Sequence, residues 1–198
     1  MEERGPVYPP PAGARKSYRP ERAGVRPPET LARFPPVGYQ GAMPHVPGLR
    51  SPYAKVGRLV YVGRMLDKIR LHAKGQLPPE YVCNIGDDKP GMFDTRCCSF
   101  LRVPYAALRD QALCPGTDEA VLAWAETIGG RRSDEECHVF NSFLMKRGWH
   151  DPADNVRRLQ ERIKESGLEG KPIETFFDYI DFDEGRDPVA VKLWESAY

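Results

Sequence analysis

From residue 51 onward, apolar residues recur every three or four positions along most of the chain, and this spacing is typical of amphipathic helices. The pattern predicts helices over residues 63–74, 93–101 and 105–113. The alternation of apolar and polar residues that indicates a half-buried strand is nearly absent. We therefore predict an all-α fold, in which several helices with short connections form one small compact domain.

Residues that favour helix ends support this division in the second half of the domain. Thr117 precedes two acidic residues, which is typical of a helix start. Ser133 and Glu136 have the spacing of a capping box, and Asp151 followed by proline predicts a further start. Gly167 predicts a helix end. The residues expected to face the core are Met65, Leu66, Ile69, Ala73, Val121, Leu122, Ala125, Ile128, Val139, Phe140, Phe143, Leu144, Val156, Leu159 and Ile163.

Proline marks several other boundaries. Ser51 followed by Pro52 has the pattern of an N-cap and a proline in the first helical position. Pro172 predicts the start of a final short helix that continues through Ile180. Between residues 81 and 91, glycine and proline turn signals predict an irregular segment.

The first 50 residues differ in composition from the rest: they hold 11 of the 20 prolines, and eight Arg and Lys residues against four Glu. Because proline fixes φ and lacks an amide donor, we predict an extended, polyproline-like arm here. The expected organisation is an arm over residues 1–50, a helical domain over residues 51–188 and a C-terminal tail over residues 189–198.

Arginine and aromatic residues are interleaved along this arm, and together they suit either a flat protein surface or an RNA backbone. The alternative is a solvated, disordered tail, because segments rich in proline and charge bury too little apolar surface to fold. If the arm binds a partner, the candidate contact residues are Tyr8, Tyr18, Arg19, Arg22, Phe34 and Tyr39.

Composition argues against some classes of function. The net charge is +1, which does not fit a general nucleic-acid binder with a basic domain face. No segment approaches the roughly 20 apolar residues that span a bilayer, and the first residues lack the apolar stretch of a secretory signal. Five cysteines, an odd number, fit reduced thiols better than a disulfide framework. We therefore expect a cytoplasmic protein without a membrane span.

A polar stripe on the predicted helix over residues 63–74 is the first candidate site. Arg64, Lys68 and His72 are spaced four apart, so they share one helical face, and Asp67 lies beside Arg64. Donors arranged in this way could hold a phosphate or a carboxylate. The alternative is an exposed polar face whose charges pair within the helix.

The acidic segment 177–187 is the second candidate site. Asp178, Asp181 and Asp183 offer the hard oxygen ligands that suit a divalent cation, but their spacing does not match an EF-hand loop. One alternative is a helix end with a capped turn, in which Arg186 pairs with a carboxylate. Another is an internal salt-bridge network in which these carboxylates receive the cations of the polar stripe. We name no metal ligand and predict no cofactor.

The remaining motifs offer no catalytic residue. Asn141 and Arg147 could project toward a site, or could satisfy carbonyl groups at a helix end. The cysteines show no paired C-x-x-C spacing, and no P-loop, nucleophile elbow or dinucleotide fingerprint is present. The candidate ligand-binding residues are Arg64, Asp67, Lys68, His72, Asn141, Arg147, Asp178, Asp183 and Arg186.

Three groups of residues form a combined pattern across the domain. They are Arg64-Met-Leu-Asp67-Lys68-Ile-Arg70, then Asn141-x-Phe143 with Arg147-Gly148 and Asp151, then Phe177-Asp178 with Asp183-Glu184-Gly185-Arg186. Together they resemble a bacterial family known as domain of unknown function 5069. The resemblance covers residues 51–188 and implies a compact helical domain of this size. It supplies no catalytic residue, because the family carries no established activity.

Our first hypothesis is a non-enzymatic accessory protein. Its helical domain would dock on a larger assembly with an acidic or mixed-charge surface, and its arm would run along that surface. The alternative is an enzyme or an anionic-ligand-binding domain, in which Arg64, Lys68 and His72 bind the ligand. In it, Asp178, Asp181 or Asp183 would act as base or metal ligand. A weaker alternative is association of the arm with RNA, particularly ribosomal RNA.

Overall fold

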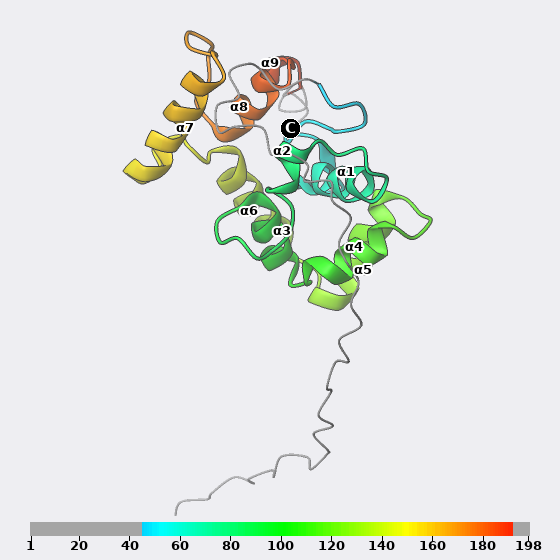
Figure 1. Cartoon of the computed structure of the whole chain (residues 1–198). Coiled ribbons are helices and arrows are strands. Elements are labelled where there is room, and N and C mark those ends of the chain that lie inside the picture. Colours follow the sequence, from blue (N-terminus) through cyan, green and yellow to red (C-terminus); the bar gives the residue numbers. More distant parts are fainter. Residues whose placement is uncertain (1–44, 192–198) are drawn as a thin grey trace, which may run out of the picture. The chain divides into compact units, whose positions relative to one another are not determined.

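The computed structural model describes residues 45–191, and within them a two-stranded antiparallel hairpin precedes nine helices (Figure 1). The strands are β1 (Lys55–Val56) and β2 (Leu59–Val60). The helices are α1 (Val62–Ala73), α2 (Pro79–Val82), α3 (Phe93–Leu101), α4 (Tyr105–Ala112), α5 (Asp118–Gly129), α6 (Asp134–Met145), α7 (Ala153–Glu165), α8 (Phe176–Asp183) and α9 (Pro188–Val191). The prediction of an all-α domain is confirmed, with a small hairpin in addition.

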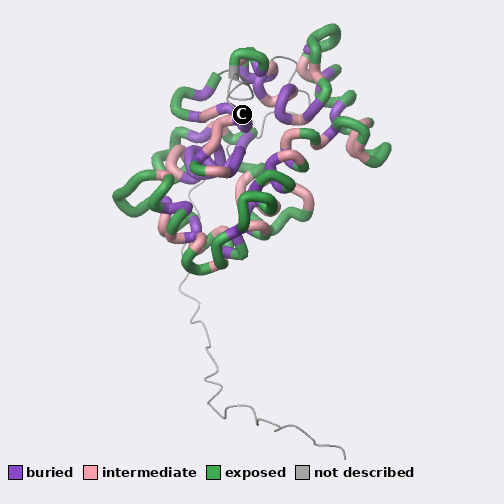
Figure 2. Tube along the Cα trace, turned by 180° about the vertical axis from the view of Figure 1, so that it is seen from behind, coloured by how far each residue is buried: buried purple, intermediate pink, exposed green. Residues whose placement is uncertain are grey.

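Helix α1 is the most deeply buried helix of the described domain. Its residues 62–69 are all buried, so its first two turns are covered on every side. Met65 and Leu66 share one apolar cluster with Phe177 of α8. Helix α1 packs against β1 and α4, whereas α3 and α4 both pack against α5. Figure 2 shows buried residues in purple along the inward sides of these elements.

A smaller apolar cluster lies between α7 and α8, which pack side by side (Figure 1). Leu159 and Ile163 form the buried face of α7, as the sequence pattern predicts, whereas Val156 is partly buried. The predicted helix end is also confirmed. Gly167 has a φ of +65°, and the amide of Leu168 donates to the carbonyl oxygen of Ile163 at 2.9 Å.

The predicted N-caps in the second half are confirmed. The Thr117 hydroxyl accepts the amide hydrogen of Ala120 at 3.2 Å at the start of α5. Ser133 and Glu136 exchange both hydrogen bonds of a capping box at the start of α6. Helix α8 starts with a further capping box at Thr175, which lies after the start predicted at Pro172. The hydrogen bonds of the capping box fix the helix start at Thr175.

The predicted helix start at Ser51 is wrong. Ser51 and the proline after it begin a turn, because the Ser51 carbonyl accepts the amide of Ala54 at 3.1 Å and the chain then enters the hairpin. The hairpin turns at Gly57, whose φ of +53° is easy only for glycine. The predicted irregular segment is found over residues 83–91, whereas Tyr81 and Val82 belong to the short helix α2.

Four residues that were predicted to face the core are exposed. Ile128, Val139 and Phe143 have exposed fractions of 60%, 57% and 46%. On α6, the buried face is formed by Cys137, Phe140, Asn141 and Leu144, so it does not include Val139 or Phe143 of the predicted apolar stripe. Ala73, at the end of α1, is exposed as well.

The packed domain includes residues before Ser51. Val46 and Leu49 are buried and form an apolar cluster with Leu77 and Tyr81. Any truncation that is meant to leave the domain intact should therefore end before residue 45.

No helix in the described range 45–191 is both long enough and apolar enough to cross a membrane. The proposed arm contacts lie outside the described residues. They are Tyr8, Tyr18, Arg19, Arg22, Phe34 and Tyr39.

The contact between α3 and α5 requires a glycine at position 129. A β-carbon at Gly129 would lie 1.7 Å from the carbonyl oxygen of Leu101, and a backbone atom cannot move aside as a side-chain end can. We expect Gly129→Ala to lower the free energy of unfolding by about 3 kcal/mol or more, measured by urea denaturation. The matched control is Gly167→Ala, which meets no atom within 4 Å and should cost only about 1–2 kcal/mol of left-handed strain. Equal losses for the two variants would contradict this account.

Candidate functional site

The polar face of α1 is buried. Arg64 and Lys68 have exposed fractions of only 3% and 2%, so the expectation of an exposed face with pairing inside the helix is wrong for both. Arg64 directly precedes Met65 and Lys68 directly precedes Ile69, and Met65 and Ile69 belong to the main apolar cluster. The elements that pack over this cluster also cover the two cations. A buried cation requires a buried counter-charge, and the structure supplies one to each from a different part of the chain.

Arg64 pairs with Glu184, which follows α8 directly. The Glu184 carboxylate also accepts a hydrogen bond from the Tyr81 hydroxyl at 2.8 Å and pairs with Arg186. Arg186 in turn donates through Nε to Asp181 at 2.8 Å. The acidic segment therefore forms a helix end and turn in which Arg186 pairs with carboxylates, and it receives Arg64 of the polar stripe.

Lys68 pairs with Asp94 in the first turn of α3, at 2.6 Å. Its amino group also donates to the Tyr61 hydroxyl and to the backbone oxygen of Asn84, both at 3.1 Å, so its three donors are all used. Burial lowers the pKa of the Lys68 amino group, while the neighbouring Asp94 carboxylate opposes that change. Among the described residues, Oδ2 of Asp94 is the one fully buried side-chain oxygen or nitrogen without a hydrogen-bond partner.

A third group of ion pairs joins α1 to the segments before and after it. Asp67 does not pair with Arg64 but accepts Nε of Arg50 at 2.7 Å. Arg50 also reaches Asp118 at 2.5 Å, and Asp118 accepts Nη1 of Arg70 at 2.6 Å. Burial raises the pKa of Asp118, but the hydrogen bonds from Arg70 and Arg50 prevail and hold it below its usual range.

We call the innermost of these groups the ionic core: Arg64, Lys68, Asp94, Asp181, Glu184 and Arg186. Its cations are paired with its carboxylates and surrounded by packed side chains. Removing one member of a buried ion pair leaves the other uncompensated, which is strongly unfavourable. The arrangement therefore holds α1, α3 and α8 in place, and its donors are already engaged by protein groups.

The other predicted residues of the acidic segment are structural neighbours of this core. Asp178 accepts the Tyr53 hydroxyl at 2.6 Å and the amide of Thr175 at 3.0 Å. Asp183 is buried as well. Among the described residues, no group of three or more His, Cys, Asp and Glu side chains could hold a metal ion.

Two predicted site residues lie apart from the ionic core. His72 is exposed near the end of α1. Asn141 is buried on α6, where its amide accepts the Val60 amide hydrogen at 3.1 Å and donates to the Arg58 carbonyl at 2.7 Å. Asn141 therefore fastens α6 to the hairpin.

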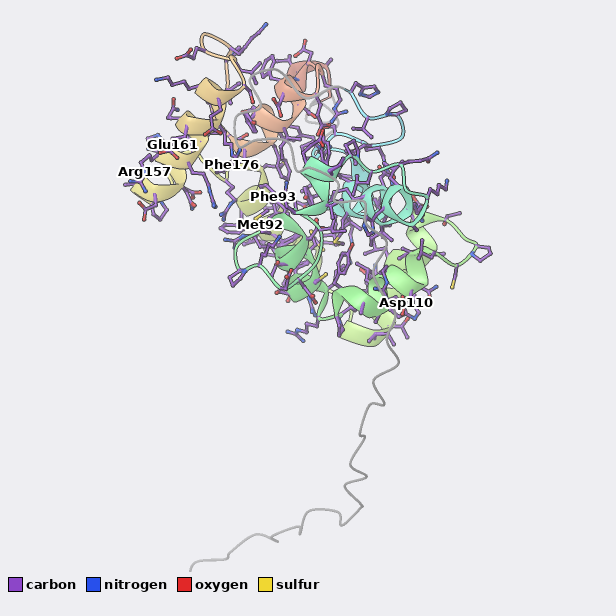
Figure 3. The ribbon with its side chains drawn as sticks, in the orientation of Figure 1. Met92, Phe93, Asp110, Arg157, Glu161 and Phe176 are labelled. Atoms are coloured by element: carbon purple, nitrogen blue, oxygen red, sulfur yellow. The ribbon has the colours of Figure 1, made fainter. Side chains whose placement is uncertain are left out.

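Arg147, just after α6, is a predicted site residue whose guanidinium is not engaged by the ionic core. Its guanidinium is half-buried and lies 5.9 Å from the ring centres of both Phe93 and Phe176. It forms no ion pair with any residue in the described part of the chain. Figure 3 labels the two rings, which come from the starts of α3 and α8.

Two adjacent cysteines, Cys97 and Cys98, have thiols of low reactivity. All five thiols are unpaired, and Cys97 and Cys98 are buried. Burial raises the pKa of Cys98 to about 12 and that of Cys97 well above its ordinary value. These two thiols stay protonated at neutral pH, which makes them poor nucleophiles.

A surface groove lies between α3 and α6. It has a volume of about 380 Å³, and its floor is a stacked pair of rings, Phe100 and Phe140, whose centres are 4.0 Å apart. Arg132 covers Phe100 from one side, with its guanidinium 5.6 Å from the ring centre. We call this hollow the α3–α6 groove. Its lining residues are Phe100, Glu135, Glu136, Val139, Phe140 and Phe143.

One alternative drawn from the sequence, an internal network between the polar stripe and the acidic segment, agrees with the pairing of Arg64 and Glu184, but the sequence did not identify Asp94 as the partner of Lys68. Asp94 has the pattern of an ordinary acid in the first turn of a helix, which is favourable by itself. The sequence of α1 did indicate that Arg64 and Lys68 are partly buried, because each directly precedes a core residue of the same helix. That spacing indicates cations at the edge of the buried face, but it cannot say which carboxylates they meet.

The pairing of Lys68 with Asp94 can be tested by a double-mutant cycle. Lys68→Met should lower the free energy of unfolding by about 3–5 kcal/mol, because it leaves Asp94 buried without a counter-charge. Adding Asp94→Leu should recover a large part of that loss, as measured by urea denaturation. The control is Arg157→Met on the exposed face of α7, which should cost less than about 1 kcal/mol. Strictly additive losses in the double variant would rule out the pairing.

The lowered pKa of Asp118 predicts a pH dependence. A carboxylate with a depressed folded-state pKa adds stability above its unfolded pKa of about 3.9, and that stability disappears as the pH falls through the folded value. Asp118→Asn should lower the free energy of unfolding by about 2 kcal/mol at pH 7, and the difference from wild type should shrink below about pH 4. The exposed Asp110 offers the control, Asp110→Asn, which should change little. A difference that is constant from pH 7 to pH 3 would contradict the role of Asp118.

Comparison with known proteins places the chain in a family without adding a function. No curated protein matches the chain in sequence. Residues 46–186, which are well over half of the chain, match the model of the family described as Domain of unknown function (DUF5069). The chain therefore belongs to the DUF5069 family.

Proposed function

We propose that this protein is a non-enzymatic interaction protein whose domain binds a partner through the α3–α6 groove. The observation that carries the proposal is the pair of exposed apolar residues on α6, Val139 and Phe143, beside the stacked rings of the groove floor. Exposed apolar patches of this kind mark interaction sites more often than isolated exposed residues do.

The rim of the groove supports a particular kind of partner. Glu135 and Glu136 line one side, and both lie in the first turn of α6. Arg96 stands over the Phe143 ring, with its guanidinium 4.8 Å from the ring centre. A protein surface that presents an apolar side chain flanked by a basic residue would complement both the floor and the acidic rim. Such a surface belongs to the mixed-charge assembly that the sequence suggests.

The ionic core favours this role over catalysis at α1. Arg64 and Lys68 are engaged by Glu184 and Asp94, so they are not available to a substrate. A catalytic group must come within hydrogen-bond reach of the substrate. An enzyme that uses the polar stripe of α1 would have to break these buried pairs first, which is costly.

The arm and the compartment complete the proposal. The proline-rich residues 1–44 would add contacts along the partner surface once the groove is occupied. Five unpaired thiols fit a reducing compartment, and we propose that the protein acts in the cytoplasm.

The proposal can be tested by affinity purification of the tagged full chain from its native host. A partner that binds the groove should be recovered with the wild type and lost, by at least about tenfold, with Val139→Glu, because a carboxylate would be buried against the aromatic floor. Val189→Glu is the matched control, since Val189 is also exposed but lies on α9. A chain that lacks residues 1–44 should retain the partner with reduced yield.

Three results would contradict the proposal. The partner could be recovered equally with wild type and Val139→Glu, which would exclude the groove. It could be lost with both Glu variants, which would indicate a non-specific effect of added charge. Loss of all partners after nuclease treatment would instead favour RNA association. Circular dichroism of each variant establishes that the domain remains folded.

A further inference from the structure

Arg147 is a half-buried cation that forms no ion pair with a described residue. Its guanidinium lies between the rings of Phe93 and Phe176 and, within the described range, takes part in neither a side-chain hydrogen bond nor an ion pair. Burial lowers its pKa, and the neighbouring Arg96 adds to this effect. The protein therefore keeps a positive charge in an unfavourable place, which is a common property of binding sites.

The other arginines in comparable surroundings are satisfied. Arg50, Arg64, Arg70 and Arg186 all pair with carboxylates. Arg132 is buried without a carboxylate, but its guanidinium donates to the backbone oxygens of Phe100 and Gly129. Arg147 differs from these five because no described residue supplies its guanidinium with a carboxylate or carbonyl acceptor.

A second guanidinium converges on the same point. Arg96 of α3 is anchored by a hydrogen bond from its Nε to the oxygen of Gly91 at 3.2 Å. A β-carbon at Gly91 would lie 3.8 Å from Nη2 of Arg147 and 3.9 Å from Nη2 of Arg96. Because position 91 is glycine, no side chain occupies this point between the two guanidinium groups.

The electrostatic surroundings of this point are positive. Arg158 of α7 contributes a third cation, and Asp151 is the carboxylate that offsets them in part. Asp151 itself accepts the amide of Gly148 at 2.9 Å and the side chain of Asn155 at 3.2 Å, so it is held in the turn after α6. Helix α3 also begins at this point without a side-chain cap, and its N-terminus adds partial positive charge.

We propose that Arg96 and Arg147 form a binding site for a phosphoryl group, next to Gly91. Guanidinium groups bind phosphate through paired N–H donors, and two of them that approach from different sides can each hold a different pair of oxygens. The ligand class is a phosphate monoester, which carries a charge near −2. This charge matches the combined charge of Arg96, Arg147 and Arg158, partly offset by Asp151. The site does not depend on the groove being occupied by a protein.

Calorimetric titration of the full chain tests the site, with inorganic phosphate as the first probe. We expect a dissociation constant on the order of 1 mM, and Arg147→Gln and Arg96→Gln should each raise it at least about tenfold. Arg157→Gln is the matched control, because Arg157 on α7 (Figure 3) is an exposed arginine, and it pairs with Asp154. It should bind phosphate as the wild type does.

Two further readouts separate binding from a structural role. Arg147→Gln should fold and unfold at the same temperature as wild type or a higher one, because it removes a buried, unpaired charge. Phosphate should raise the unfolding temperature of wild type but not of this variant. Glycerol phosphate and N-acetylphosphoserine amide, titrated in parallel, distinguish two sources of the phosphoryl group. Tighter binding of glycerol phosphate indicates a small molecule, and tighter binding of N-acetylphosphoserine amide indicates a phosphorylated protein.

The proposal is overturned if phosphate fails to bind wild type at tens of millimolar. It is also overturned if Arg147→Gln binds phosphate as tightly as wild type, or if Arg157→Gln loses binding to the same extent. Because the probe is inorganic phosphate, these results do not depend on whether the groove variants lose a protein partner.

Discussion

The pairing of the buried Arg64 guanidinium with the Glu184 carboxylate is the interaction on which the arrangement of this domain depends. A charge can be buried only where a partner meets it, so α1 cannot be placed in the core until the residues after α8 are in position. Lys68 imposes the same condition on α3 through Asp94. Together the two cations of α1 tie the first third of the domain to its middle and its end.

The side chains that serve the fold and those proposed to serve binding form two sets, an inward one and an outward one. The inward set is engaged by protein groups, and its members stabilise the fold when every pair is complete. The outward set lies along α3, α6 and the turn after α6, where apolar side chains and the guanidinium of Arg147 face solvent without such partners. Arg96 belongs to both features of this surface, because it covers a groove residue and points toward Gly91. A partner that presents a phosphorylated residue beside an apolar one would contact both.

Local patterns in the sequence predicted most of the helices. The sequence did not predict the contacts between residues that are far apart along the chain. The capping box at Ser133 depends on residues three apart, so its outcome was readable from the chain. The hairpin was missed because each strand has only two residues, too few for an alternating pattern. Val139 and Phe143 were assigned to the core because periodicity shows that a face is apolar, but not how much of it a neighbour covers. The residues predicted to form one candidate site lie in different places for a related reason. Arg64 and Arg147 are both cations in the pattern of motifs found in the sequence, and only their surroundings distinguish an internal ion pair from an open site.

The central claim is that the charges of α1 serve the fold, whereas Arg96 and Arg147 serve binding. Nuclear magnetic resonance of the arginine Nε–H groups, recorded while phosphate is added to the full chain, tests this claim most directly. The resonances of Arg147 and Arg96 should move with phosphate, and those of Arg64 and Arg186 should stay in place and exchange slowly with water. Movement of the Arg64 and Arg186 resonances, with Arg147 and Arg96 unchanged, would contradict it.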